Sequence, residues 1–183
     1  MKGRALAVAF FLALAAACGG SGAPANETAA DALNRGLAAH TAGKLDDAVA
    51  AYYTTLAKDP SNKFALYNLG EIAQRQNRLA AAESFYRLAL EQDPKMSSAL
   101  FNLAIVRTNL GAPADAVGLY RQVIALEPNY AAAHFNLGLL LRQLGQTAEA
   151  QAELAKAQQL DSKLVAPSAS ASPARQATAT PRP

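Results

Sequence analysis

Residues 63–96 read KFALYNLGEIAQRQNRLAAAESFYRLALEQDPKM, and this stretch decides the fold because its pattern returns along the chain at steps of 34 residues. A proline closes the stretch at Pro94, and Pro60 and Pro128 stand one step before and one step after it. A fixed period of this length is typical of an architecture of stacked repeats. Equivalent positions hold asparagine at Asn34, Asn68, Asn102 and Asn136, tyrosine at Tyr52, Tyr86 and Tyr120, and alanine at Ala48, Ala82, Ala116 and Ala150.

Each unit has the composition of two helices joined by a tight turn. Gly43, Asn77, Gly111 and Gly145 separate two helix-forming stretches, and these residue types tolerate the left-handed conformation that ends a helix. The proline that follows cannot continue a helix. The sequence therefore predicts an all-α fold of four helix-turn-helix units, with helices over 29–42, 45–58, 63–76, 79–92, 97–110, 113–126, 131–144 and 147–160.

Small residues recur where the two helices of a unit should meet. The first helices carry Gly36, Gly70, Ala104 and Gly138 at equivalent positions, and an aromatic residue recurs on the second helices. A residue without a large side chain lets two helices approach closely, and a ring can fill the space beside it. We therefore expect the aromatic position to fill the space beside the small residues.

Together these positions resemble the tetratricopeptide repeat family. The resemblance covers residues 29–162, in register as 29–62, 63–96, 97–130 and 131–164, and it implies a right-handed α-solenoid. The ends depart from the pattern, since Ala32 and Arg35 replace leucines in the first repeat and Ser162 replaces the proline of the last. Terminal units of solenoids often differ in this way because one side faces water.

The resemblance implies that the first helices line a concave groove for a partner. Asparagine has one acceptor and two donors and can pair with an extended peptide backbone. An alternative is that these asparagines only form bonds within their own helices. The groove predicted in this way contains Leu33, Tyr67, Phe101 and Phe135 beside Asn34, Asn68, Asn102 and Asn136, with Arg75 and Arg142 at its rim.

The first residues, MKGRALAVAFFLALAAACGGSG, have the pattern of a signal peptide. Lys2 and Arg4 precede a short apolar run, which is too short to span a bilayer as a helix. Small residues then lead to Cys18, the one cysteine of the chain, and this pattern resembles the lipobox of bacterial lipoproteins. The resemblance implies a signal peptide at 1–17, a lipidated Cys18 with a tether over 18–28 and, because residue 19 is Gly, the outer membrane. An ordinary secretory signal, which would give a soluble secreted or periplasmic protein, and an uncleaved anchor remain open.

The charge distribution argues against a nucleic-acid partner. The formal net charge is +3, but Lys2, Arg4, Lys163, Arg175 and Arg182 lie outside residues 26–162, which leaves the repeat region slightly acidic. The segment 163–183 is rich in Pro, Ala and Ser, and a composition of that kind predicts disorder.

The sequence has no pattern that indicates catalysis, a cofactor or a metal site. One cysteine cannot form a cysteine-based zinc site, and no phosphate-binding or dinucleotide-binding motif occurs. His134 occupies a packing position and is predicted to be structural. We therefore expect a non-enzymatic adaptor without cofactor or metal. It would be anchored in the outer membrane and face the periplasm. Its partner would be another envelope protein or peptide, and it is similar to repeat lipoproteins that assemble pilus and secretion machinery. Alternatives are a self-associating structural lipoprotein, which would be a homo-oligomer, and a regulator of a peptidoglycan-processing enzyme.

Overall fold

The structure is a computed structural model that describes residues 26–166. The predicted signal peptide, Cys18 and most of the predicted tether and tail lie outside the described residues. Within 26–166 the regular structure is helical, with no strand, and none of these helices is long and apolar enough to cross a membrane. The helices are α2 (Ala29–Thr41), α3 (Leu45–Lys58), α4 (Lys63–Arg75), α5 (Leu79–Gln92), α6 (Ser97–Asn109), α7 (Pro113–Leu126), α8 (Ala131–Gln143) and α9 (Thr147–Leu160).

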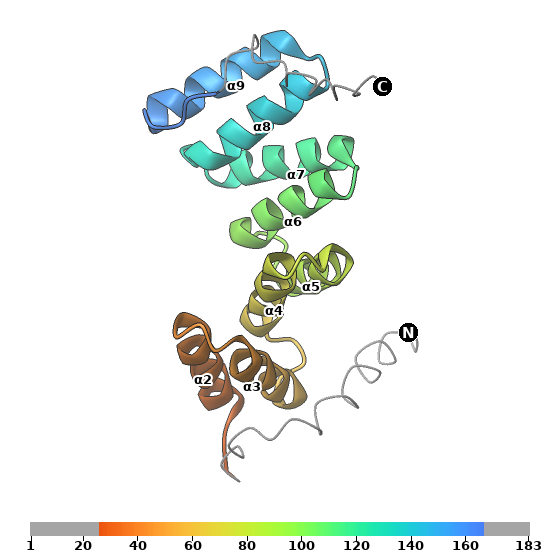
Figure 1. Ribbon diagram of the computed structural model, residues 1–183, viewed down its shortest axis with the longest axis vertical. Coiled ribbons are helices and arrows are strands. Elements are labelled where there is room, and N and C mark those ends of the chain that lie inside the picture. The colour runs from red at the N-terminus through yellow and green to blue at the C-terminus, as the bar shows by residue number, and fades with distance from the viewer. Residues whose placement is uncertain (1–25, 167–183) are drawn as a thin grey trace, which may run out of the picture. The chain divides into compact units, whose positions relative to one another are not determined.

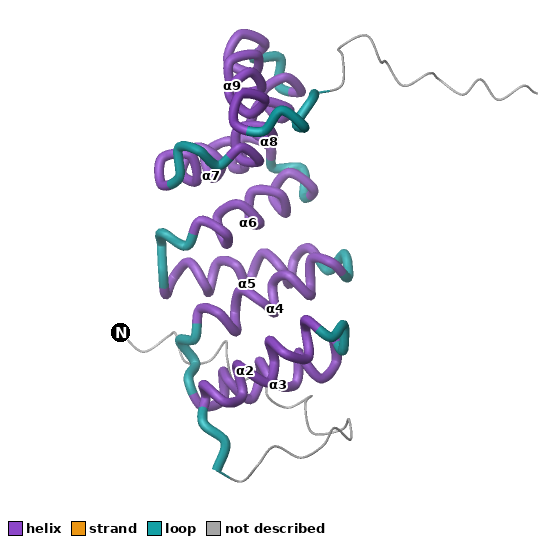
Figure 2. Tube along the Cα trace, turned by 90° about the vertical axis from the view of Figure 1, so that its left-hand side faces the viewer, coloured by secondary structure: helices purple, strands orange, loops and turns teal. Residues whose placement is uncertain are grey.

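Each predicted repeat is one pair of packed helices. The pairs are α2 with α3, α4 with α5, α6 with α7, and α8 with α9 (Figure 1). The chain divides into two compact units, residues 1–128 and 129–183. We call them unit 1, which contains the first three repeats, and unit 2, which contains the fourth. Within unit 1 successive repeats are joined by packing of α3 on α4 and of α5 on α6 (Figure 2). The predicted all-α solenoid class is confirmed.

The turns between paired helices have the geometry that the Gly and Asn positions predicted. Gly43, Asn77, Gly111 and Gly145 all have positive φ, between 57° and 78°. In the first turn Lys44 N–H donates to the Ala39 carbonyl and Gly43 N–H to the His40 carbonyl, and the other three turns repeat this pair of bonds. Such bonds satisfy carbonyls at a helix end that would otherwise have no donor.

The first helix of each repeat ends one residue before the predicted boundary. The predicted ends at 42, 76, 110 and 144 were wrong, because these residues have ψ near 0° and already belong to the turn. The second helices, by contrast, span the predicted residues.

The close approach of paired helices depends on a glycine that faces a ring. A Cβ atom on Gly36 would lie 2.6 Å from Tyr52 Cε1, and a Cβ atom on Gly70 would lie 2.6 Å from Tyr86 Cε1. Both tyrosine rings are fully buried. In unit 2 the position opposite Gly138 is occupied by Leu154, whose Cγ would lie 2.7 Å from such a Cβ. The predicted pairing of small and large residues is thus confirmed in these three repeats.

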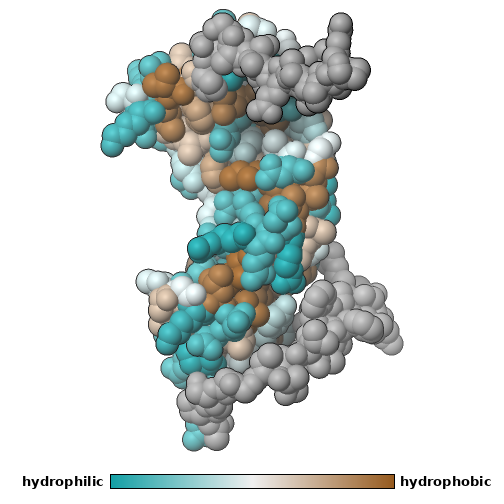
Figure 3. Space-filling view, in the orientation of Figure 1, coloured by the Kyte–Doolittle hydropathy of each residue, from teal (hydrophilic) through white to brown (hydrophobic). Residues whose placement is uncertain are grey.

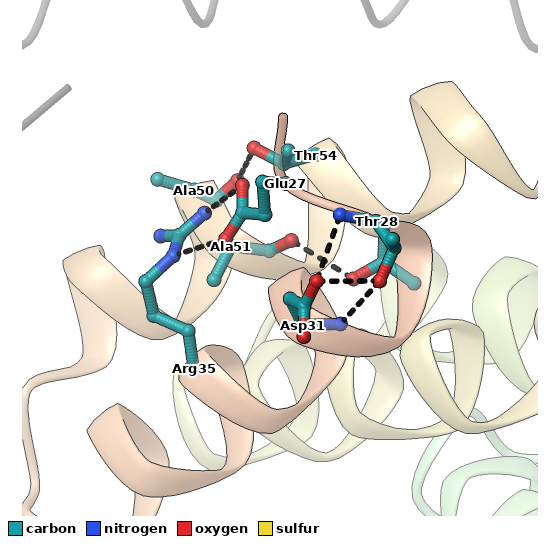
Figure 4. Close-up of polar contacts among 8 residues, drawn as sticks. Glu27, Thr28, Asp31, Arg35, Ala50, Ala51 and Thr54 are labelled. Atoms are coloured by element: carbon teal, nitrogen blue, oxygen red, sulfur yellow. Dashed lines mark hydrogen bonds and ion pairs between the residues drawn. The ribbon is translucent and has the colours of Figure 1, made fainter. Parts of the chain in front are cut away.

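An ion pair with a buried carboxylate covers the N-terminal end of unit 1. The carboxylate of Glu27 is 3% exposed and accepts two bonds from Arg35, at 2.8 Å from Nε and 3.1 Å from Nη2. The Arg35 guanidinium holds the pKa of Glu27 below its usual value. Figure 4 shows the two side chains pointing toward each other beside Ala51 of α3. Arg35, an unusual residue for its repeat position, therefore has a structural role at the end of the solenoid.

The next residue, Thr28, begins α2 with a capping box. Thr28 Oγ1 accepts a bond from the Asp31 backbone N–H, and Asp31 Oδ2 accepts one from the Thr28 backbone N–H (Figure 4). These two bonds satisfy donors at the helix start. Glu27 and Thr28 together fix the first residues of the described chain onto the first repeat.

The C-terminal end carries a polar outer face. In α9, Ala150 and Ala157 are buried, whereas Gln151, Ala155 and Gln158 are exposed. The equivalent residues of α3 are Val49, Tyr53 and Leu56, which are half-buried or buried. Polar and small residues at this face are what a terminal repeat needs, because no repeat within residues 26–166 covers it.

Candidate partner-binding face

The first helices of unit 1 bury one side and leave the other open. On α4 the buried side holds Leu66, Leu69, Gly70 and Ala73. The helices α4 and α6 also contact each other directly, so their open sides form one continuous surface. We call the open sides of the three first helices the inner face, and it consists of Leu33, Asn34 and Leu37 of α2, Phe64, Tyr67, Asn68 and Glu71 of α4, and Phe101, Asn102 and Ile105 of α6.

The inner face exposes large apolar side chains. Phe64 is 50% exposed and Leu37 is 41% exposed. Tyr67 and Phe101 are half-buried, and the Phe101 ring packs edge-on against Tyr120 at 5.7 Å between centroids. Apolar and polar residues lie side by side on the part of unit 1 that the space-filling view presents (Figure 3). A surface that exposes aromatic and aliphatic groups together has the composition of a protein-binding site.

The predicted asparagines do not share one environment. Asn34 is exposed, whereas Asn68 is 9% exposed and donates from Nδ2 to the Phe64 carbonyl at 2.7 Å. Asn102 donates to the Tyr67 hydroxyl at 3.1 Å, which connects α6 to α4. The local bonding that the sequence left open therefore occurs at Asn68. Each of these amides has two donors and an acceptor, so one bond does not exhaust its capacity.

Tyr67 connects the groups of the inner face. Its ring lies 5.8 Å from the Tyr86 ring, and its hydroxyl accepts the Asn102 bond. Burial, and after it the charge of Glu71, raise the pKa of Tyr67 to about 12. The phenol therefore stays neutral at physiological pH and can take part in hydrogen bonds as donor and acceptor.

The predicted rim arginines are not equivalent to each other. Arg75 is exposed at the end of α4, while Arg142 is half-buried in α8 of unit 2. The residue of the second repeat that corresponds to Arg142 is Gln74, whose Oε1 accepts a bond from the Tyr86 hydroxyl at 2.8 Å. Sequence reasoning missed Gln74 because a glutamine in a helix has no distinctive pattern. One signal could have identified Gln74: its equivalent in the first repeat is the polar residue His40, which lies near the Tyr52 hydroxyl.

Unit 2 holds the remaining predicted groove residues. Phe135 and Asn136 are half-buried on α8. His134 is 6% exposed, and its Nδ1 lies 2.6 Å from Glu153 Oε2, so the pair joins α8 to α9. The structural role predicted for His134 is confirmed. Among the residues that the structure describes, no cluster of three His, Cys, Asp or Glu side chains could hold a metal ion.

Paired helices with a continuous open face define the class of helical-repeat interaction scaffolds. Three family models, each described as tetratricopeptide repeat, match residues 27–97, 99–131 and 119–152. The chain therefore belongs to the tetratricopeptide repeat family. A comparison with curated proteins gave no match.

Solved structures of repeat proteins resemble this structure. A crystal structure of MamA protein is 25% identical, with a TM-score of 0.68, and the match covers 73% of this chain and 73% of that one. A tetratricopeptide repeat protein from Parabacteroides merdae is 27% identical, with a TM-score of 0.67 over 74% of this chain. The match covers 54% of the Parabacteroides chain, so this chain spans about half of that protein. The fold is thus that of a scaffold for protein–protein interaction.

Proposed function

We propose that this protein is a non-enzymatic adaptor whose inner face holds an extended segment or a helix of another protein. The observation that carries the proposal is the position of exposed Phe64 and Leu37 on the same surface as Asn34 and Asn102. Apolar groups would supply binding free energy, and the amides would fix the direction and register of a peptide backbone.

The expected affinity is modest. A net hydrogen bond contributes about 0.5–1.5 kcal/mol, so a few asparagines alone would give weak binding. Burial of exposed apolar surface adds about 25 cal/mol per Å² before the costs of association are subtracted. We therefore expect a dissociation constant in the micromolar range, which corresponds to a standard free energy of binding of about −8 kcal/mol.

The proposal places the adaptor at the bacterial outer membrane through a lipid on Cys18. Support comes from the sequence, in which the lone cysteine follows an apolar run and precedes Gly19, Gly20, Ser21 and Gly22. More than one acyl chain makes such an anchor stable. The proposed setting is the assembly of pilus or secretion machinery. A self-associating lipoprotein and a regulator of a peptidoglycan-processing enzyme remain the alternatives, and the identity of the captured partner distinguishes the three.

Replacing both Asn68 and Asn102 with alanine will weaken partner capture without loss of helicity. The change removes two amides from the inner face, one of which bonds to its own helix and the other to Tyr67. The measurement is affinity capture from an envelope extract with the intact chain and the double variant, with bound proteins identified by mass spectrometry. We expect at least one specific partner to be reduced by about tenfold or more, because two bonds at 0.5–1.5 kcal/mol each are lost.

The matched control is the pair Gln92→Ala and Gln122→Ala, which removes two exposed amides from the second helices α5 and α7. This control should retain the partner. Equal recovery by the wild type and the Asn68/Asn102 variant would show that the inner face is not the working surface.

Replacing Cys18 with serine will release the protein from the membrane fraction. A serine cannot form the thioether that carries the lipid, so the outer-membrane pool should move to the soluble fraction. The measurement is fractionation followed by immunoblotting, with Ser21→Ala in the predicted tether as control. Retention of the Cys18→Ser protein in the membrane would contradict a lipid anchor.

A further inference from the structure

The inner face of unit 1 carries one carboxylate, at Glu71. It lies on α4 one helical turn after Tyr67. The equivalent residues of the other repeats are Leu37, Ile105 and Leu139, all aliphatic. An acid in the middle of an otherwise apolar and amide-bearing row does not help the helix to pack, so its position calls for a chemical reason.

No cation of the chain neutralises Glu71 within residues 26–166. The salt bridges found there do not include it, and Arg75, four residues later on the same helix, does not reach it. Several other acids of unit 1 are paired: Glu27 with Arg35, Asp93 with Lys63, and Glu83 with Arg87 and Arg107. Glu71 is therefore a half-buried negative charge on the proposed binding surface that no cation of the described chain pairs with.

The charge of Glu71 influences tyrosines on three helices. The negative charge of Glu71 acts on the hydroxyl groups of Tyr52 on α3, Tyr67 on α4 and Tyr86 on α5, and in each case it adds to the rise in pKa that burial causes. The Glu71 side chain is half-buried, so its carboxylate is partly shielded from water.

A half-buried carboxylate on an exposed, largely apolar surface is a favourable site for a cationic side chain. The charge attracts the cation and its N–H groups in a charge-assisted hydrogen bond. Two helical turns earlier on α4, the exposed ring of Phe64 can make a separate cation–π contact. Phe64 already shows this capacity, because Lys63 Nζ lies 5.2 Å from the centre of its ring.

We propose that Glu71 selects a lysine or arginine side chain of the partner segment that docks on the inner face. The inference rests on the proposed function, since it names the chemistry of the occupant of the same surface. The partner segment would carry one basic residue flanked by apolar residues. The basic group would reach Glu71, and the apolar neighbours would cover Leu37, Phe64 and Phe101.

The test is selection from a library of random peptides displayed on phage. The bait is the full chain purified in mild detergent, as wild type, Glu71→Gln and Glu71→Lys. The control is Glu91→Gln, which makes the same change of charge at an exposed position on α5. Circular dichroism shows whether each bait keeps its helices.

We expect the wild type and the Glu91→Gln control to enrich peptides with Lys or Arg at one fixed position. The Glu71→Gln bait should lose that preference, and the Glu71→Lys bait should prefer Asp or Glu at the same position. A selected peptide should bind Glu71→Gln about tenfold more weakly than wild type. A peptide in which alanine replaces the basic residue should bind the wild type about tenfold more weakly as well. Combining both changes should cause no further loss of affinity, because each removes the same interaction.

Two negative outcomes are distinguishable. If all baits enrich peptides with the same sequences, including the basic residue, the inner face binds peptides but Glu71 does not select them. If no bait enriches any peptide, the proposed function of the inner face fails, and the role of Glu71 fails with it.

Discussion

Replacing Gly70 with alanine will lower the free energy of unfolding, whereas replacing Gly118 with alanine will raise it. Both glycines lie inside helices, Gly70 in α4 and Gly118 in α7. A Cβ atom on Gly70 would lie 2.6 Å from the Tyr86 ring, but a Cβ atom on Gly118 would meet no atom within 4 Å. The same chemical change should therefore have opposite effects at the two positions.

The size of the effect follows from how firmly Tyr86 is held. Its ring is fully buried, it lies 5.8 Å from the Tyr67 ring, and its hydroxyl donates to Gln74. An added methyl group in such a site costs about 1–3 kcal/mol, which exceeds the up to about 1 kcal/mol that alanine gains over glycine in a helix. We expect a net loss of up to about 2 kcal/mol for Gly70→Ala and a gain of about 0.5–1 kcal/mol for Gly118→Ala.

The measurement is urea unfolding of the full chain followed by circular dichroism, with the slope of the transition compared among the proteins. Unchanged slopes would indicate that the variants change stability rather than the unfolding mechanism. If Gly70→Ala were as stable as Gly118→Ala, the close approach of α4 and α5 would not constrain this position.

The sequence predicted the helices and which helices pack together, because the same residue types recur at equivalent positions of each repeat. Four copies of the Gly or Asn turn and three copies of the glycine opposite a large residue leave few alternative pairings. Single positions were harder. The ends of the first helices were placed one residue late, because residues 42, 76, 110 and 144 have near-helical φ and differ only in ψ.

The binding face was predictable as a surface but not in its chemistry. Repetition identified Asn68 and Asn102 as equivalent, yet one bonds to its own helix and the other to a neighbouring one. Such differences depend on which side chain lies next to each amide in space. A periodic pattern treats equivalent positions as identical and does not show these differences. Glu71 and Arg35 are departures from the pattern, and only the structure shows that Arg35 is paired and Glu71 is not.

Replacing Phe64 with alanine will weaken partner binding by about tenfold or more while leaving the fold nearly unchanged. Phe64 is 50% exposed, so its truncation removes few contacts within the protein. Substitutions at such positions usually change stability by no more than about 0.5 kcal/mol. The Lys63 amino group, which lies over the ring, keeps its ion pair with Asp93 at 2.7 Å.

The expected loss in binding comes from the area that an aromatic residue buries in an interface. Aromatic anchors are among the residues whose truncation costs 2 kcal/mol or more in protein complexes, which corresponds to a loss of about thirtyfold in affinity. Phe64 stands on the same helix as Tyr67, Asn68 and Glu71, so it is in a position to contact a segment that reaches those groups. A tenfold loss of affinity is therefore the smallest effect that we expect for Phe64→Ala.

The matched control is Leu126→Ala at the end of α7, a large apolar residue that is 38% exposed but lies outside the inner face. Binding is measured by fluorescence anisotropy with a labelled partner segment, taken from the captured protein or from the selected peptides. Loss of affinity in Phe64→Ala alone would locate binding on the inner face. If Leu126→Ala lost as much as Phe64→Ala, the apolar contribution would come from general surface hydrophobicity, and the assignment of the inner face as the binding surface would be wrong.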